Sequence, residues 1–245
     1  MTRLFHGKRM HFAVLLFSFF ILPVTAQASV VVTGTRVIYP ESAREVTVKL
    51  NNEGSTPALI QSWIDNGDPK ATPDVATSPF ILTPPIARID SHKGQVLRIR
   101  FDDDKTLPQD KESIYWLNIL ELPPSVEDGS NKLKIAVRTR LKMFYRPSGL
   151  QGDADKMAGD LEWTMVRSGN KTTLDCYNSG AYYVSLNSVK VGGKKVELNM
   201  TNGTVAPKQT QHFEMDNNAT PGALINYSTI NDYGAVMAWD STLKN

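Results

Sequence analysis

The residues that could do catalytic or metal chemistry are few and far apart. Beyond residue 28 the chain holds two histidines, His92 and His212, with no metal-ligand spacing between them. It also holds one cysteine, Cys176, in a strand-like run where a buried thiol acting as a small hydrophobic group is favoured over a reactive one. No zinc-protease motif, nucleophile elbow or phosphate-binding loop is present. We therefore expect no metal and no cofactor, and an enzyme becomes a weaker hypothesis.

The N-terminus has the features of an export signal. These are a basic start, an apolar stretch and a small-x-small motif, at Arg3, Lys8 and Arg9, at Phe12–Val24 and at Ala26-Gln27-Ala28. The pattern predicts that residues 1–28 are a signal peptide cleaved before Ser29. A membrane anchor is the alternative, but the apolar stretch is shorter than the roughly 20 residues that span a bilayer.

Removing this segment changes the charge balance. Without residues 1–28 the chain has 217 residues, and 24 of its 27 basic residues remain against all 25 acidic ones, a net charge of −1. A chain that is close to neutral gives no reason to expect nucleic acid as a partner. A product of this size can bury a sufficient core without disulfides, although export would permit them.

The remaining chain reads as a succession of short strands. Val46, Val48 and Leu50 alternate with polar residues, which is the period of a half-buried strand. Gly192-Gly193 separates two such runs and indicates a hairpin turn. Other strands are expected at 59–64, 79–89 with a break at Pro84-Pro85, 96–101, 114–122, 133–137, 161–166, 182–191, 196–198, 211–215 and 224–230. This regular spacing, without helical periodicity, predicts an all-β sandwich or barrel.

A break in this pattern divides the chain. The segment Pro147–Asp153 is rich in Gly, Ser and Pro, and a polar stretch follows it. We place a domain boundary here, which gives an N-terminal domain at 29–150 and a C-terminal domain at 151–245. Each part has the size of a small antiparallel sandwich.

Four stretches resemble the periplasmic chaperones of the chaperone–usher pathway, the PapD-like family. They are Gly34–Tyr39, Leu107–Pro123, Ile135–Pro147 and Ile230–Gly234. The resemblance implies two immunoglobulin-like β-sandwich domains in an L-shaped arrangement, a periplasmic location and no enzymatic activity. The short loop between Pro124 and Leu133 resembles the branch of the family that serves rod-forming and tip pili. The segment Asn178–Tyr183 departs from the family pattern, which puts that turn in doubt and not the fold.

The resemblance also implies a function. Such chaperones bind fimbrial (pilin) subunits and adhesins, lend them a missing β-strand and deliver them to the outer-membrane usher. Self-association of the free chaperone is left open. Here the donor strand would carry Leu133, Ile135 and Val137, whose alternation places all three side chains on one face. The alternative is that these residues simply face the protein's own core.

Two further groups of residues follow from the resemblance alone. Arg36 and Lys142 correspond to the basic pair that grips the subunit's C-terminal carboxylate in the cleft between the domains. Glu112, Arg146 and Asp232 correspond to a charge cluster that sets the angle between the domains. On sequence grounds alone, Arg36 and Lys142 would be interpreted as solvated surface charges.

A carbohydrate-binding sandwich or adhesin is the second hypothesis. The four tryptophans of the chain could supply a face on which sugars stack: Trp63, Trp116, Trp163 and Trp239. Core packing is expected for at least two of them. A periplasmic sandwich enzyme is the third hypothesis.

Overall fold

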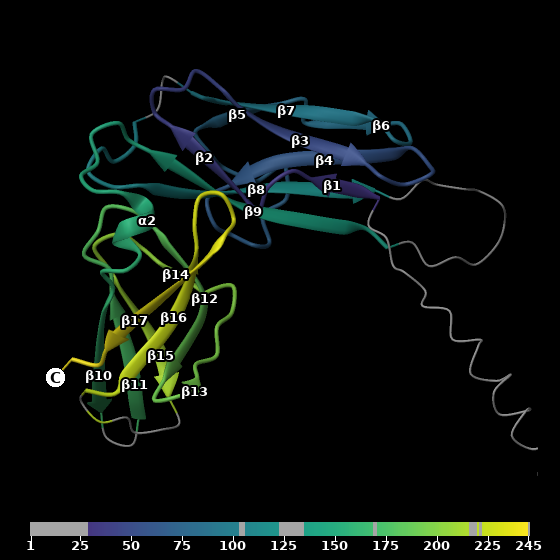
Figure 1. Ribbon diagram of the computed structural model, residues 1–245. Helices are drawn as coiled ribbons and strands as arrows, with labels where there is room; N and C mark the ends of the chain where they lie inside the picture. Colours follow the sequence, from purple (N-terminus) through teal and green to yellow (C-terminus); the bar gives the residue numbers. More distant parts are fainter. Residues whose placement is uncertain are drawn as a thin grey trace, which may run out of the picture.

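The computed structural model describes residues 29–102, 106–122, 135–168, 171–215, 220 and 222–244. Over these residues the chain forms two β-sandwiches that meet at an angle, with one short helix at their junction (Figure 1). This confirms the all-β, L-shaped fold class. The predicted signal at 1–28, the predicted short loop and Leu133 lie outside the described residues. Within the described ranges, no helix is long and apolar enough to cross a membrane.

The N-terminal sandwich consists of two sheets. One sheet has the order β1 (Val30–Val32), β3 (Val46–Asn52), β7 (Gly94–Phe101) and β5 (Phe80–Thr83). The other has the order β2 (Arg36–Pro40), β9 (Val137–Arg146), β8 (Ser113–Leu122), β4 (Ala58–Asp65) and β6 (Ile86–Ile89). All pairs are antiparallel except β2 with β9.

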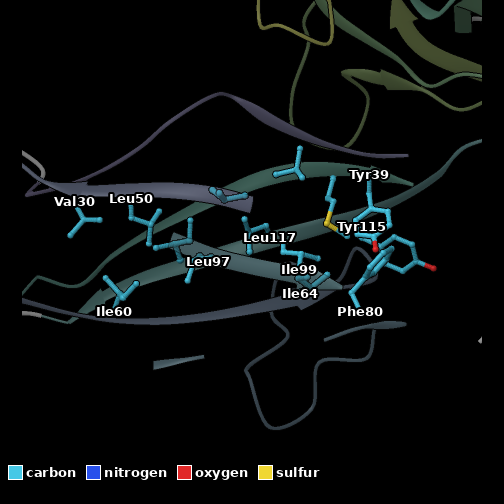
Figure 2. Close-up of a cluster of buried hydrophobic side chains, with 14 of the residues drawn as sticks. Val30, Tyr39, Leu50, Ile60, Ile64, Phe80, Leu97, Ile99, Tyr115 and Leu117 are labelled. Atoms are coloured by element: carbon cyan, nitrogen blue, oxygen red, sulfur yellow. The ribbon is translucent and has the colours of Figure 1, made fainter. Parts of the chain in front are cut away.

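Alternating apolar residues build the core between these sheets. On β3, Val48 and Leu50 are buried, whereas Thr47 and Lys49 are exposed. The neighbouring strands do the same, so their inward side chains meet in one cluster that includes Leu97 (Figure 2). Burial of each such side chain contributes about 1.5–3 kcal/mol. The alternation seen in the sequence therefore specifies which face of each strand is inside.

From β1 to β8 each connection passes from one sheet to the other, and two of these crossings have a special backbone geometry. Between β1 and β2 the chain turns at Gly34, whose φ of 94° lies in the left-handed region that favours glycine. Between β5 and β6 it passes through Pro84-Pro85, with a cis peptide bond before Pro84. The first of these crossings brings β2 alongside β9, which is where the candidate site lies.

The C-terminal sandwich also has two layers. One sheet has the order β10 (Glu162–Ser168), β11 (Lys171–Tyr177) and β15 (Thr210–Met215). The other has the order β13 (Lys194–Lys195), β12 (Val184–Val191), β16 (Leu224–Ile230) and β17 (Val236–Thr242), with β14 (Thr204–Val205) also paired to β12. Helix α2 (Ala154–Met157) precedes β10, and its N-cap Asp153 accepts hydrogen bonds from two backbone N–H groups.

Two sequence predictions for this domain are confirmed and one is wrong. Cys176 is fully buried in the core, and desolvation raises the pKa of its thiol, so it is a packing residue. Gly192 and Gly193, with φ of 55° and 82°, form the hairpin turn between β12 and β13. The strand expected at 196–198 is absent because β13 ends at Lys195 and the chain then turns Val196 inward, into the core.

The hairpin between β16 and β17 joins the two domains. It extends from the C-terminal sandwich up to the N-terminal one (Figure 1). Its Gly234 has a φ of 84°, and a Cβ added there would lie 2.7 Å from Thr35 Oγ1 of the N-terminal domain. Only glycine allows this close approach, which brings the strand end before the hairpin next to β2.

Candidate functional site

A three-residue charge cluster lies where the domains meet. Arg146 at the end of β9 donates from Nε to Glu112 Oε1 at 2.7 Å, and from Nη1 and Nη2 to the two carboxylate oxygens of Asp232 at 2.7 and 3.1 Å. Glu112 and Arg146 belong to the N-terminal domain, and Asp232 to the C-terminal one. The structure therefore brings together all three residues that the resemblance placed in an interdomain cluster, with a bidentate arginine between two carboxylates.

Glu112 holds a second contact across the junction. Its Oε2 accepts the backbone N–H of Tyr183 at 2.8 Å, and its own N–H donates to the carbonyl of Ala181 at 2.9 Å. Desolvation raises the pKa of this buried carboxyl, although Arg146 and the Tyr183 N–H act against the shift. Desolvation by itself would lower the pKa of Arg146, but its bonds to Asp232 and the charge of Glu112 outweigh it and raise that pKa.

Two cations stand side by side next to this cluster. Arg36 begins β2, and in the parallel pairing of β2 with β9 its direct partner is Lys142. Arg36 donates from Nη1 to the carbonyl of Ile230 at 2.7 Å, while its buried Nε has no partner. Lys142 donates from Nζ to Ser185 Oγ at 3.2 Å and to Thr204 Oγ1 at 2.5 Å. The structure thus places both predicted anchor residues at the domain junction.

Within the part of the chain that the structure describes, the two cations lack a compensating carboxylate. Among the described residues, neither Arg36 nor Lys142 has a carboxylate within ion-pair distance, although Asp232 lies close enough to act on Arg36 electrostatically. Desolvation lowers the pKa of Arg36. Desolvation, with the charge of Arg36 next, lowers the pKa of Lys142 to about 8. A half-buried pair of like charges with an unused N–H is the arrangement expected of an anion-binding site.

The partners of Arg36 and Lys142 in the C-terminal domain were missed by the sequence analysis. Ser185 on β12, Thr204 on β14 and Ile230 at the end of β16 reach the site only because the two domains pack together. A small pocket between the domains is lined by Arg36, Ser185, Ile230 and Asp232. No local motif marks these residues, because what matters is their position after folding and not their spacing.

Strand β9 leaves the domain core at its N-terminal end. The side chains of Tyr145 and Met143 are buried, and Leu141 packs at the margin of the same core. The row continues outward to Val137, which is 44% exposed, and Ile135, just before the strand, is 65% exposed. The alternative that the predicted donor residues face the protein's own core is therefore wrong for Ile135 and Val137, which are exposed, and the core contacts of this face begin only further along β9. Their role as a donor strand stays a prediction.

The same part of β9 has an unpaired edge. Strand β8 pairs with β9 from Val137 to Tyr145, but β2 pairs only with Lys142–Arg146. Within the described residues no strand covers the other edge of Val137–Leu141. Unpaired N–H and C=O groups beside apolar side chains form a template for another β-strand.

The four tryptophans do not form an open sugar-stacking face. Trp163 is fully buried and Trp63 nearly so. Trp116 is half-buried under Arg140, and half-buried Trp239 donates from Nε1 to Thr229. Nothing in the described structure thus favours the carbohydrate-binding hypothesis.

The two histidines lie apart, and within the described residues no group of three His, Cys, Asp or Glu side chains could hold a metal ion. On β15 of the C-terminal domain, Nδ1 of His212 lies 2.7 Å from Oδ1 of Asp175. His92 occupies a turn of the N-terminal domain, with a φ of 56°.

Two immunoglobulin-like sandwiches with a cation pair at their junction, and beside it a strand with one unpaired edge and exposed apolar side chains, define a protein that binds another polypeptide chain. Residues 29–151 match the family described as "Pili and flagellar-assembly chaperone, PapD N-terminal domain". Residues 156–240 match "Pili assembly chaperone PapD, C-terminal domain". The chain belongs to the PapD family of pilus-assembly chaperones.

Individual relatives cover nearly the whole chain. The chaperone protein FimB/FhaD of Bordetella pertussis is 42% identical over 91% of this chain and 92% of its own length. The crystal structure of the YadV chaperone is 35% identical, with a TM-score of 0.74 over 88% of this chain and all of that one. The SafB chaperone of Salmonella enterica, solved in complex with the SafA pilin, is 28% identical, with a TM-score of 0.75 over 89% of this chain and 98% of that one.

Proposed function

We propose that this chain is a periplasmic chaperone that binds fimbrial subunits, stabilises them by donor-strand complementation and delivers them to the outer-membrane usher. The observation that carries the proposal is the open edge of β9 at Val137–Leu141, with exposed apolar side chains on the strand face that continues from the core. A subunit that lacks one strand needs both features: backbone groups to pair with and side chains to fill its core. The solved complex of the related SafB chaperone with a pilin supports the proposal.

The donor strand carries Leu133, Ile135 and Val137. Ile135 and Val137 are exposed in the free protein. Burial of each side chain in a subunit contributes about 1.5–3 kcal/mol before the ordering costs of binding are subtracted. Main-chain hydrogen bonds along the strand depend little on sequence, which suits a chaperone that serves several related subunits and an adhesin.

Arg36 and Lys142 bind the C-terminal carboxylate of the subunit. Their support is the uncompensated, partly desolvated cation pair and the unused Nε–H of Arg36. Lys142 is five residues along β9 from Val137, about 16 Å in an extended strand. Because the anchor fixes where the subunit chain ends, it also fixes which subunit residues pair with the donor strand. Alternation alone leaves this register undefined.

Glu112, Arg146 and Asp232 orient the two domains, so that the anchor groups of the N-terminal domain meet Ser185 and Thr204. Their support is the pair of bonds from Arg146 to carboxylates of different domains. Buried ion pairs contribute little net stability, because desolvation offsets the attraction. The cluster therefore sets geometry more than stability.

Export and domain limits complete the proposal. Residues 1–28 act as a signal peptide that directs the chain to the periplasm, and the domains extend over 29–150 and 151–245. The chaperone acts by binding subunits and catalyses no reaction. In the absence of a subunit, the open edge of β9 is available to a second copy of the chain.

Co-expression tests the proposal directly. The chaperone is expressed with the fimbrial subunit, adhesin and usher encoded beside it, and complexes are isolated from periplasmic extract. We expect equimolar chaperone–subunit complexes, and transfer of subunits to membranes that carry the usher. If the subunit stays soluble and intact without the chaperone, or never co-purifies with it, the proposed function is wrong.

A further inference from the structure

The outward face of β9 has an unusual environment. Arg138 and Arg140 point away from the core, on the face opposite Val137 and Leu141. Arginines on the outer face of a strand are normally solvated. Here their side chains are only 28% and 11% exposed, and they lie on the stretch of β9 whose edge is unpaired.

Arg140 is held by a buried carboxylate. Its Nη2 lies 2.6 Å from Oδ1 of Asp65, a β4 residue whose side chain is fully buried. Its guanidinium carbon lies 4.3 Å from the ring centroid of Trp116, within the range of a cation–π contact. Two different strands, β4 and β8, thus fix this side chain of β9.

Arg138 is held even more extensively. Its Nε and Nη2 donate to Oδ1 of Asn118 at 3.0 and 2.7 Å, and its Nη1 donates to the carbonyl of Pro69 at 2.9 Å. Its guanidinium carbon lies 4.7 Å from the ring centroid of Trp63. The loop after β4, which contains Pro69, therefore closes over the outer face and clamps the arginine against the sheet.

Asp65 and Asn118 form the centre of this network. Both are fully buried, and Asn118 Nδ2 donates to Asp65 Oδ2 at 2.7 Å. Asp65 Oδ1 also accepts the backbone N–H of Gly67 at 2.7 Å. Asn118 therefore links Arg138 to Asp65 by hydrogen bonds, and Asp65 Oδ2 also lies 3.7 Å from Nη2 of Arg138. Asp65 binds Arg140 directly at 2.6 Å.

We propose that Asp65 and Asn118, acting through Arg138 and Arg140, are positioning residues that keep the open part of β9 extended and ready before a subunit arrives. This inference rests on the proposed function. A strand that is hydrogen-bonded along one edge only opens locally with ease. If it is disordered before binding, ordering it costs free energy when the partner binds. Because Arg138 and Arg140 are held in place, the strand is already extended in the free protein. The side chains on the opposite face, such as Val137, stay free to contact the partner.

Two altered chaperones test the inference. One is Arg138→Met, and the other combines Asp65→Asn with Arg140→Met, so that no buried charge of that pair is left alone. The readouts are hydrogen exchange in Val137–Leu141 and the rates of association and dissociation with the fimbrial subunit encoded beside the chaperone. If ordered β9 falls to a tenth of the molecules, apparent affinity falls about tenfold, and we expect the loss in the association rate.

Two control variants separate positioning from general stability. Arg98→Met removes an arginine that is 65% exposed on the other sheet of the same domain. Leu174→Ala destabilises the core of the C-terminal domain far from β9. Neither change should alter exchange in Val137–Leu141 or the association rate. Arg138→Lys keeps the positive charge but not the several N–H donors of the guanidinium. It should restore part of the association rate that is lost in Arg138→Met.

The outcomes are distinguishable. Should Arg138→Met leave both exchange and association as in the parent chain, the positioning role is refuted, even if the double variant fails to fold. It is equally refuted if Leu174→Ala slows association as much for the same drop in melting temperature. If the parent chain captures no subunit at all, the proposed function fails instead.

Discussion

Arg36 and Lys142 are direct partners in the parallel pairing of β2 with β9, so two cations face the junction of the domains from adjacent strands. Each donates to neutral groups of the C-terminal domain and, within the described residues, neither has a carboxylate at ion-pair distance. Such an arrangement costs free energy in the free protein, because desolvation and repulsion both act on Lys142. A carboxylate from a partner would relieve that cost.

Removal of either cation should strongly weaken subunit capture without unfolding the chaperone. A charge-assisted hydrogen bond contributes about 1.5–3 kcal/mol, so Arg36→Ala or Lys142→Ala should weaken binding about 10- to 150-fold. Co-purification of a subunit and a melting curve measure the two effects. Arg98→Ala, which removes an exposed side chain of β7 in the same domain, is the control. Wild-type recovery of subunit with either anchor variant would refute the assignment.

Capture should weaken at alkaline pH. The free chaperone has a Lys142 pKa of about 8, and only the protonated ammonium pairs with a carboxylate. Affinity should be complete below about pH 8 and fall by up to tenfold per pH unit above it, until the pKa of the complex is reached. Binding of a synthetic peptide with the subunit's C-terminal sequence measures this. The amidated peptide, or Lys142→Met, should bind weakly and without this pH dependence.

The stability of the free chaperone should depend on pH in the opposite direction and rise where the affinity for subunits falls. Lys142 has an ordinary pKa of 10.5 when unfolded and about 8 when folded, so between these values the unfolded state binds more protons. The contribution of Lys142 to the free energy of unfolding therefore rises with pH in this window. Lys142→Met should remove that rise and stabilise the free protein at neutral pH by roughly 1–3 kcal/mol. Urea unfolding at pH 7 and 10 compares the two; a destabilised methionine variant contradicts the assignment.

The predicted donor strand should tolerate an added charge only on the face that points away from the subunit core. Ile135→Glu should weaken capture by roughly 1.5–3 kcal/mol or more, since it places a carboxylate where the subunit core should close. Ala136→Glu introduces the same residue one position away, on the other face of a continued strand, and is the matched control. Titration of a subunit with each variant gives the two dissociation constants. Equal loss in both would remove the donor-strand assignment.

The interdomain cluster should respond unequally to loss of its members. Arg146→Met leaves Glu112 buried without its cation and should destabilise the fold by about 3–5 kcal/mol. Asp232→Asn leaves the bond from Arg146 to Glu112 in place and should cost much less, while loosening the angle between the domains. Chemical unfolding measures the first effect and small-angle scattering the second. Identical stability of the two variants would contradict this account.

Local patterns predicted much of the fold. The alternation of Val46, Val48 and Leu50 specified the inner face of β3, and Gly192-Gly193 specified a hairpin, because both signals depend only on neighbouring residues. The charged residues at the domain junction were predicted only from the family resemblance, because no local sequence pattern marks them. The strand expected at 196–198 was wrong: Val196 and Leu198 pack into or against the core, which produces the apolar alternation, but the chain forms no strand there.

The rest of the site depends on contacts between distant parts of the chain. Thr204 reaches Lys142 from the other domain, and Arg138 and Arg140 are covered by β4, β8 and a loop. On sequence grounds a strand arginine would be read as solvated, as most are. Only the packing of the two sandwiches shows which polar residues act together.

Hydrogen exchange of the chaperone, free and bound to its fimbrial subunit, tests the central claim most directly. If the subunit pairs with the open edge of β9, the amides of Ile135–Leu141 should become strongly protected on binding, while those of β7 on the other sheet should stay unchanged. Unaltered exchange in Ile135–Leu141, with protection appearing on another surface of the chaperone, would contradict donation of this strand.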